Sequence, residues 1–252
     1  MSAVDPALRR RVLDAHGDAW QAEGRRRAAH GGGAAEIRGA RLMASGIATA
    51  KWNNADITDA GVDLDAMRAW YAVRDVPWGM RVPLGLEVDL GTPLFEKRSL
   101  YLAVSSPWNP PPSSLSLRRC GGDDFETFAA AEVAAFGGDL ETSHRWLAPV
   151  FGSDGFEHWI AADPGGAIAA IASTVRTDER AGPAMMVTGV ASVGASHPRD
   201  IEGFAAAIIA ASFDEGVGLV HAHAIGEAEA ALWLGLGFAE VPGFLIRVVR
   251  PD

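Results

Sequence analysis

His221 and His223 form the residue pair with the clearest chemical potential in this sequence. They stand two positions apart in an apolar run that predicts a β-strand, so both side chains point to the same face of a sheet. Two adjacent imidazoles can act as acid and base near neutral pH, or supply part of a metal site. The alternative is a structural role on a partly exposed strand or beneath a helix. Two histidines without a carboxylate partner at a fixed spacing do not make a metal site, and we expect no metal.

Composition and missing motifs exclude several classes of function. The 22 Lys and Arg residues against 32 Asp and Glu residues give a formal charge of −10, which repels phosphate backbones and anionic membrane surfaces. The sequence contains no Walker loop, dinucleotide fingerprint, GxSxG elbow, CxxC or HExxH motif. We therefore expect a small-molecule partner, with neither nucleic acid nor a membrane as a partner.

Cysteine usage and the apolar segments predict the compartment. Cys120 is the one cysteine and cannot form a disulfide within the chain, which fits a reducing environment. The N-terminal segment lacks the apolar core of a signal peptide, and no apolar stretch reaches the roughly 18 to 20 residues of a membrane-spanning helix. These features predict a cytoplasmic protein.

Three consecutive prolines within residues 107–114 predict a linker, because proline neither continues a helix nor donates to a sheet ladder. The linker divides the chain into a small mixed domain, residues 1–106, and a larger domain, residues 115–252. The patterns of the first domain predict helices near Asp5–Ala29 and Asp63–Val73, and β-like segments near Ile37–Trp52, Met80–Val88 and Leu100–Val104.

The second domain has the predicted order β-α-α-β-β-β-α-β-α-β, which is a mixed α/β class. Asp123 and Glu126 predict a capping box at its first helix, and the turn residues 163–166 predict a hairpin. A helix between two strands requires those strands to run parallel, so strands 184–193 and 218–224 should be parallel neighbours. The predicted elements are Ser114–Arg118, Phe125–Phe136, Leu140–Phe151, Glu157–Ala162, Ala167–Arg176, Ala184–Val193, Asp200–Asp214, Gly218–Ala224, Glu227–Leu234 and Gly243–Val249.

The order and spacing of four segments resemble the C-terminal catalytic domain of the GNAT superfamily of acyl-CoA N-acyltransferases. Residues 123–137 are similar to the first helix of that domain, 187–193 to its fourth strand, 216–224 to its fifth strand and 230–238 to its closing helix. Residues 1–106 more weakly resemble the degenerate GNAT-like half of two-domain members. The resemblance implies a GNAT-like acyltransferase fold in residues 115–252, with a smaller degenerate half that completes the cleft.

The resemblance also implies where an acyl-CoA co-substrate binds. In such a fold the fourth and fifth strands diverge, the pantetheine arm pairs with the free backbone of the fourth strand, and the pyrophosphate lies on the next helix N-terminus. A backbone N–H near Ala191 then holds the oxyanion of the reaction. The residues implied for the coenzyme are Val190, Ala191, Ser192, Val193, His197, Pro198, Arg199, Asp200 and Ile201.

The sequence departs from the family pattern at two places. Asp200 and Glu202 stand where the phosphate loop normally has glycines, and carboxylates there add bulk and repel a pyrophosphate. An alignment with a one-residue insertion instead places Arg199 ahead of Gly203 and restores a small residue. Trp233 occupies the place of the tyrosine that protonates the departing thiolate, and an indole cannot deliver a proton in this pH range.

These observations predict one primary function and two alternatives. The primary prediction is transfer of an acyl group, such as acetyl, from acyl-CoA to the amine of a small molecule. His221 or His223, titrating near neutrality in the cleft, or else water, would replace the tyrosine. Asn53, Arg81 and Trp233 are the expected substrate-side residues, although the first two fit a strand end and a turn equally well.

The first alternative is a GNAT-like scaffold that does not use coenzyme A, and that binds a small ligand or performs acid–base chemistry with the histidine pair. The second alternative is a non-catalytic interaction protein. A homodimer is one oligomeric state that the sequence allows.

Overall fold

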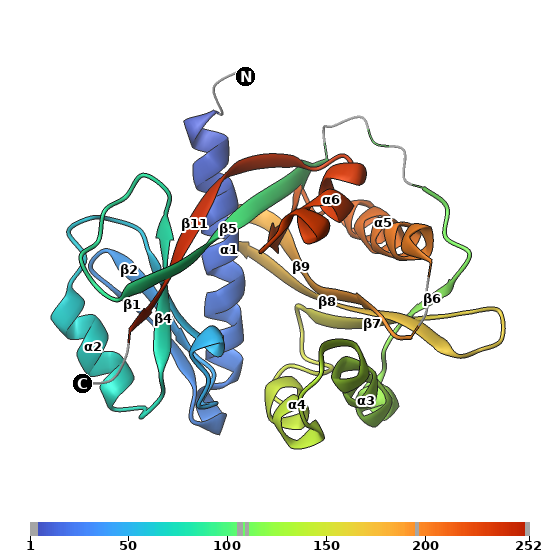
Figure 1. The fold of residues 1–252 in the computed structure, drawn as a ribbon, viewed down its shortest axis with the longest axis horizontal. Helices are drawn as coiled ribbons and strands as arrows, with labels where there is room; N and C mark the ends of the chain where they lie inside the picture. The colour runs from blue at the N-terminus through green and yellow to red at the C-terminus, as the bar shows by residue number, and fades with distance from the viewer. Residues whose placement is uncertain (1–4, 105–107, 109–110, 195–196, 250–252) are drawn as a thin grey trace.

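The computed structural model describes residues 5–104, 108, 111–194 and 197–249 (Figure 1). The elements of the first part are α1 (Pro6–Arg26), β1 (Gly33–Ile37), β2 (Ala40–Ala44), β3 (Asn53–Ile57), α2 (Leu64–Ala72), β4 (Trp78–Pro83) and β5 (Thr92–Ala103). The elements of the second part are β6 (Ser116–Arg119), α3 (Phe125–Phe136), α4 (Leu140–Leu147), β7 (Phe156–Ala162), β8 (Ile168–Glu179), β9 (Gly182–Ser192), α5 (Pro198–Asp214), β10 (Leu219–Ala224), α6 (Glu227–Gly235) and β11 (Ala239–Val249). No helix in the described ranges is long and apolar enough to cross a membrane.

All strands join one mixed sheet of eleven strands, in the order β1-β2-β3-β4-β11-β5-β10-β9-β8-β7-β6. At the centre of the sheet β5 and β11 pair with each other. β11 also pairs with β4, and β5 also pairs with β10, and all three pairings are antiparallel. On either side of this centre lies a parallel pair, β3 with β4 and β9 with β10. Each part of the chain therefore completes its sheet with a strand from the other part.

The mixed α/β class is confirmed, and so are several individual elements. The hairpin predicted around residues 163–166 is formed by β7 and β8, and α3 has the predicted bounds. The strands before and after α5 are parallel neighbours, as expected. The proposed linker stays a prediction, because residues 107, 109 and 110 lie outside the described part of the chain.

One expectation for the first part is wrong. The run Ile37–Trp52 is not a single β-like segment, because it contains the end of β1, all of β2 and a short 3-10 turn at Ala50–Trp52. Gly39 stands between β1 and β2 with a φ of 76°, a conformation that glycine adopts without steric cost. This glycine makes a tight reversal that the apolar pattern concealed.

The start of α3 also differs from the predicted capping box. Asp124 is the residue at the cap, and its carboxylate accepts a hydrogen bond from the backbone N–H of Gly121 at 2.8 Å. The same carboxylate binds the guanidinium of Arg118 on β6 at 2.6 and 2.7 Å. The acidic cluster at this helix start therefore anchors the preceding strand rather than forming a reciprocal box with Glu126.

α1 lies across the boundary between the two parts of the sheet (Figure 1). The helix begins where the Asp5 side chain accepts a hydrogen bond from the N–H of Ala7 at 2.9 Å, and Pro6 fits the first helical position. Its buried face contacts β1 and β2 in the first part, and β8, β9, β10 and β11 in the second. The helix thus brings side chains from residues 6–26 close to strands more than 150 positions away.

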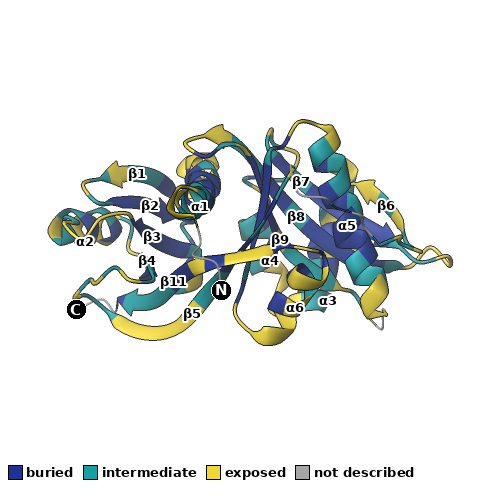
Figure 2. Ribbon diagram, turned by 90° about the horizontal axis from the view of Figure 1, so that it is seen from above, coloured by how far each residue is buried: buried dark blue, intermediate teal, exposed yellow. Residues whose placement is uncertain are grey.

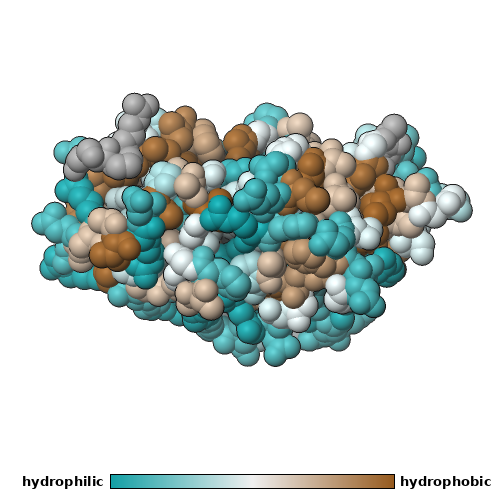
Figure 3. Space-filling model, turned by 90° about the horizontal axis from the view of Figure 1, so that it is seen from below, coloured by the Kyte–Doolittle hydropathy of each residue, from teal (hydrophilic) through white to brown (hydrophobic). Residues whose placement is uncertain are grey.

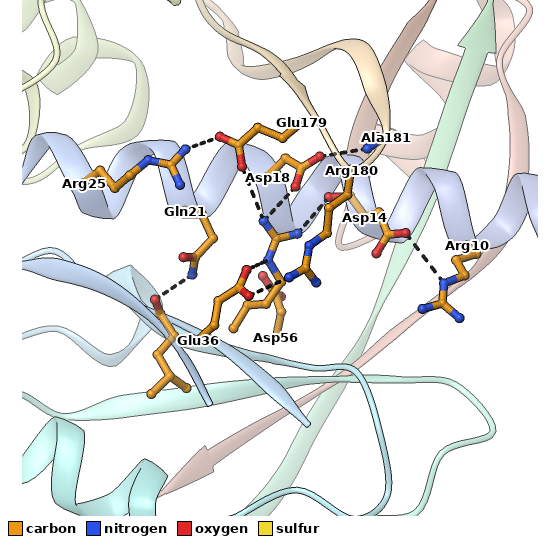
Figure 4. Close-up of polar contacts among 12 residues, drawn as sticks. Arg10, Asp14, Asp18, Gln21, Arg25, Glu36, Asp56, Glu179, Arg180 and Ala181 are labelled. Atoms are coloured by element: carbon orange, nitrogen blue, oxygen red, sulfur yellow. Dashed lines mark hydrogen bonds and ion pairs between the residues drawn. The ribbon is translucent and has the colours of Figure 1, made fainter. Parts of the chain in front are cut away.

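Asp18 is a buried polar residue at the centre of the α1 interface (Figure 4). Its carboxylate accepts hydrogen bonds from the Arg41 guanidinium at 2.7 Å and from the Ala181 N–H at 3.0 Å. Arg41 lies on β2 and Ala181 lies between β8 and β9, so one carboxylate joins both parts of the chain. Gln21, one turn further along, donates to the Leu42 carbonyl at 2.7 Å.

Buried residues lie along the strands of both parts of the sheet (Figure 2). On β10 the even-numbered residues pack under α5 and α6, whereas Leu219 packs against Val12 of α1. Side chains alternate along a strand, so His221 and His223 also lie on the α1 face. On the face drawn in Figure 3, hydrophobic side chains form separate patches divided by hydrophilic ones.

Candidate functional site

β9 and β10 pair over only part of their length. The pairing runs from Leu219 opposite Ala184 to His221 opposite Met186, and both strands then continue without pairing to each other in the described residues. Backbone groups of β9 after Met186 consequently have β8 on one side and an opening on the other. This is the divergence that the sequence analysis expected at the carboxyl ends of the two strands.

A β-bulge in β9 lies at the opening. The register between β8 and β9 shifts between Ile171 and Ser173, which leaves Gly189 and Val190 opposite a single residue. Gly189 has a φ of 62°, which favours glycine over residues with a Cβ. A bulge bends its strand and interrupts the ladder, so this feature accounts for the divergence of β9 from β10.

A cavity of about 130 Å³ lies at this opening and is lined by residues of α1, β5, β9, β10 and α6, and by Ile225, which follows β10. α1 contributes Trp20, β5 contributes Lys97, and the closing helix α6 contributes Glu229 and Trp233. β9 contributes Met186, Val187, Thr188, Gly189 and Val190. His223 at the end of β10, the following Ile225, and Leu232 of α6 complete the lining.

Lys97 supplies a titratable amine in this cavity. Burial and the charge of Arg81 together lower the pKa of Lys97 to about 8, while Glu229 and Asp56 act in the opposite direction. A group with a pKa near 8 is present in both protonation states at neutral to mildly alkaline pH. Lys97 can therefore donate and accept a proton under the conditions in which most enzymes work.

Three histidines form a buried cluster beside the cavity. His16 of α1 faces His221 and His223 of β10, and its ring centroid lies 4.0 Å from that of His223 and 6.4 Å from that of His221. The Nδ1 of His223 lies 3.2 Å from the Ser99 Oγ on β5, and the Nε2 of His16 lies 3.9 Å from Asp56. His223 belongs to both the cluster and the cavity wall.

The expectation that the histidine pair titrates near neutrality is wrong. Burial lowers the pKa of His221 to about 3, and the charge of Lys97 adds to this effect. Burial also lowers the pKa of His16 and of His223 well below the usual value, with further contributions from Lys97 and Arg81. All three imidazoles are neutral at pH 7, so none of them can act as a general acid there.

No protein-family model matches this sequence, and no curated protein is similar to it in sequence. Solved structures are similar in fold. A GCN5-related N-acetyltransferase from Kribbella flavida has a TM-score of 0.64 at 14% identity, covering 94% of this chain and 96% of its own. A tandem GNAT protein from the clavulanic acid biosynthesis pathway has a TM-score of 0.51 at 14% identity, covering 84% of this chain and 79% of its own. The chain has a two-domain GNAT fold.

A third similar structure is the N-myristoyltransferase of Saccharomyces cerevisiae with bound myristoyl-CoA. It has a TM-score of 0.51 at 11% identity, covering 79% of this chain and 61% of its own. In the GNAT fold of this chain, β9 and β10 take the places of the fourth and fifth strands of the second half. The residues expected to bind the coenzyme lie beside the opening. Val190, Ala191 and Ser192 form the end of β9, and Val193 follows it.

The start of α5 is the expected pyrophosphate position in the GNAT fold. His197 caps the helix, and its imidazole accepts a hydrogen bond from the Arg199 N–H at 3.2 Å, while its carbonyl accepts one from the Asp200 N–H at 2.9 Å. Pro198 has no N–H to offer. Asp200 is further held by the Ser114 hydroxyl at 2.5 Å. The N–H groups of Arg199 and Asp200, which would otherwise be available to an anion, are therefore engaged within the chain. Ile201, the last residue expected to contact the coenzyme, follows in the same turn.

The alternative alignment assigns the phosphate loop to Gly203, which lies within α5. Gly203 is buried, and a Cβ at its position would lie 2.7 Å from the Pro112 carbonyl oxygen and from the Ser113 Cα. The absence of a side chain at Gly203 therefore permits α5 to pack against the chain that precedes β6.

Trp233 lies in the cavity wall, and its indole N–H is buried without a hydrogen-bond partner in the described part of the chain. The same holds for the indole N–H of Trp20. Both tryptophans line the cavity, so a ligand oxygen that reaches either indole N–H would supply the missing acceptor. The sequence analysis had assigned Trp233 to the substrate side, but Trp20 was missed because only the packing of α1 places it there.

Asn53 and Arg81 were the other expected substrate-side residues, and both are engaged in contacts within the chain. The Asn53 side chain accepts a hydrogen bond from the Ser45 N–H at 2.8 Å and donates to backbone carbonyls, including that of Ile47 at 2.8 Å. Arg81 binds Asp56 through two hydrogen bonds of 2.5 and 3.1 Å, and lies over the ring of Trp20 at 4.2 Å. Arg81 therefore acts on the cavity through its charge and its support of the indole.

A larger cavity, of about 370 Å³, lies between α1 and the carboxyl ends of β3 and β4. Its basic side chains have partners within the chain: Arg9 donates to the Leu84 carbonyl at 2.6 Å, Arg10 lies 3.7 Å from Asp14, and Arg41 binds Asp18 at 2.7 Å (Figure 4). The smaller cavity at β9 and β10 is the stronger candidate site, because it combines unpaired donors with an amine of lowered pKa.

Proposed function

We propose that this chain transfers an acyl group from acyl-CoA to the amine of a small molecule. The observation that carries the proposal is the opening between β9 and β10, where a bulged strand with free backbone groups meets a cavity containing Lys97. A thioester lying along β9 would bring its acyl group to this cavity. The GNAT fold and the acyl-CoA complex of a similar structure support the choice of donor.

In this proposal the backbone of Gly189–Val193 binds the pantetheine arm in the manner of an added strand. The carbonyl carbon of the thioester is attacked by the nitrogen of the neutral acceptor amine, and the resulting oxyanion is held by the N–H near Ala191. The indole N–H groups of Trp20 and Trp233 are further donors on the acyl side of the cavity.

Lys97 replaces the missing tyrosine as the general acid. When the tetrahedral intermediate collapses, the carbon–sulfur bond breaks and its electron pair remains on sulfur. The Lys97 ammonium then gives a proton to the thiolate, and the new amide nitrogen loses its extra proton to solvent. A pKa near 8 suits this role, whereas His221, with a pKa near 3, carries no proton to give at pH 7.

A second function is favoured by the start of α5, where His197 and Asp200 occupy the positions of the usual phosphate contacts. If this helix cannot accept a pyrophosphate, the same cavity serves a ligand without coenzyme A. That ligand would be a small molecule with an oxygen acceptor for the indoles. The two proposals differ in one respect that can be measured, which is whether an acyl-CoA binds and reacts.

The test of the primary proposal is a thiol-release assay with acetyl-CoA and longer acyl-CoA donors, each combined with a panel of small amines. Lys97→Met should lower kcat by about 100-fold or more, because a general acid contributes about 10² to 10⁴ to the rate. Lys51→Met is the matched control, because Lys51 is the only other lysine in the chain and lies over Trp52 outside this cavity. Absence of amine-dependent thiol release with every donor would favour the second function.

A further inference from the structure

The histidine cluster has a donor arrangement that the acyl-transfer proposal does not use. His16, His221 and His223 each offer a ring nitrogen, and these three atoms all lie within 4.8 Å of one another. The three side chains come from two elements that only the fold brings together, α1 and β10. His16 and His221 are completely buried, and His223 is largely buried.

Five of the six ring nitrogens in this cluster have no hydrogen-bond partner in the part of the chain that the structure describes: His16 Nδ1 and Nε2, His221 Nδ1 and Nε2, and His223 Nε2. A buried polar atom without a partner costs free energy, and such atoms are rare in native proteins. Five of them on three adjacent rings therefore indicate that a ligand joins the rings.

We propose that His16, His221 and His223 bind a divalent transition-metal ion, of which Zn²⁺ and Co²⁺ are the probes of choice. Imidazole nitrogen is a preferred ligand of Zn²⁺, and three histidines with one open position are a known donor set of catalytic zinc sites. If a tetrahedral metal lies about 2.1 Å from each nitrogen, the nitrogens are roughly 3.4 Å apart. The nitrogens in the structure lie within 4.8 Å of one another, so the widest pair must approach by at most roughly 1.4 Å. Rotation of the imidazole rings about their side-chain bonds supplies a movement of this size.

The surroundings of the cluster match this assignment. The Ser99 hydroxyl at 3.2 Å from His223 Nδ1 fixes that ring and leaves Nε2 for the metal. Asp56 lies 3.9 Å from His16 Nε2, which is too far for a hydrogen bond but places a carboxylate beside the second ring.

Two cations act on this cluster. Arg81 is neutralised by its two hydrogen bonds to Asp56, whereas Lys97 has no comparably close acid among its described contacts. A protonated Lys97 repels a second cation across the low-dielectric interior. Replacing Lys97 by methionine should therefore tighten metal binding by about fivefold or more, a change opposite in sign to its effect on acyl transfer.

The metal proposal does not depend on the acyltransferase proposal, because its readout is binding of the metal alone. Purified full-length protein is stripped with a chelator and titrated with Zn²⁺ in competition with a chromogenic chelator. Co²⁺ is titrated in parallel, and its visible absorption reports the coordination geometry. We expect one equivalent of metal per chain with a tetrahedral Co²⁺ spectrum.

His16→Gln and His223→Gln should each weaken Zn²⁺ binding by about 100-fold or more. His158→Gln is the matched control, since His158 is also buried but stacks on Phe151 outside the cluster. It should bind like the wild-type protein. Wild-type protein that binds no metal, or variants of the cluster that bind as tightly as the control, would overturn the assignment. Because the wild-type titration stands alone, a variant that fails to fold does not prevent the decision.

Discussion

Lys97 and the three clustered histidines are basic side chains whose protonation is decided by burial rather than by residue type. Removal from water disfavours the charged form, so the pKa of Lys97 falls to about 8 and that of His221 to about 3. The sequence correctly identified the pair His221 and His223 as residues on one face of a strand, but it assigned them the wrong protonation. It could not identify Lys97, because nothing in the local sequence distinguishes a lysine that packs under a helix from an exposed one.

The pKa of Lys97 is directly measurable, because the chain contains only two lysines. In protein labelled with ¹⁵N-lysine, one of two side-chain amine signals should titrate with a midpoint near 8 and disappear in Lys97→Met. The unfolded chain holds this proton up to its ordinary pKa near 10.5, so between pH 8 and 10.5 the unfolded state binds more protons. The free energy of unfolding should therefore rise with pH in this window, relative to Lys97→Met. A midpoint above 10 for both signals would contradict the proposed role.

The acids Asp200 and Glu202 should weaken coenzyme binding at the start of α5. Each carboxylate repels a pyrophosphate by on the order of 1 kcal/mol after screening, so Asp200→Gly/Glu202→Gly should tighten the Kd for acetyl-CoA by about tenfold or more. Calorimetry measures the difference, and Asp214→Gly, at the far end of the same helix, is the control. Tight binding by the wild-type protein that is weakened by the double substitution would show that the loop is aligned incorrectly.

At the scale of elements, α1 has the largest effect on the site, because it brings His16 and Trp20 to strands of the second part. The sequence predicted this helix and nearly every element of residues 115–252, since periodicity and turn residues are local signals. It did not predict His16 as a partner of His223, because the two residues lie 207 positions apart and only tertiary packing joins them. Sequence periodicity alone also did not separate β1 from β2.

Asp18 is the residue on which the position of α1 should depend most. Asp18→Ala removes the partner of a buried guanidinium and of the Ala181 N–H, so it should lower the free energy of unfolding by about 3 to 5 kcal/mol. Arg10→Ala, which breaks an exposed pair on the same helix, should cost less than about 1 kcal/mol. Denaturant unfolding compares the two variants, and similar small losses for both would contradict the central role of Asp18.

At the scale of the whole molecule, the exchange of β5 and β11 makes the two parts of the chain interdependent. Without β5, the strand β10 loses its antiparallel neighbour, and without β11, the strand β4 loses one as well. The order of these strands could not be predicted from the sequence, because strand pairing between the parts leaves no local pattern. The sheet therefore runs continuously through strands of both parts of the chain.

Fragments 1–106 and 107–252, expressed separately, should each lack a cooperative thermal transition, because each would expose unpaired strand edges at the centre of the sheet. Mixing or co-expressing the fragments should restore one transition with the circular dichroism of the intact chain. A cooperative transition of fragment 107–252 alone would show that the second part folds independently of β5.

A structure determined with bound acetyl-CoA tests the central claim most directly, which is that the opening between β9 and β10 holds the reacting thioester. The account predicts the pantetheine arm along residues 189–193 and the thioester sulfur within reach of the Lys97 amine, in the wild-type protein or in the tighter-binding Asp200→Gly/Glu202→Gly variant. Acetyl-CoA bound elsewhere, such as at the carboxyl ends of β3 and β4, or an opening that stays empty in both proteins at saturating ligand, would contradict it.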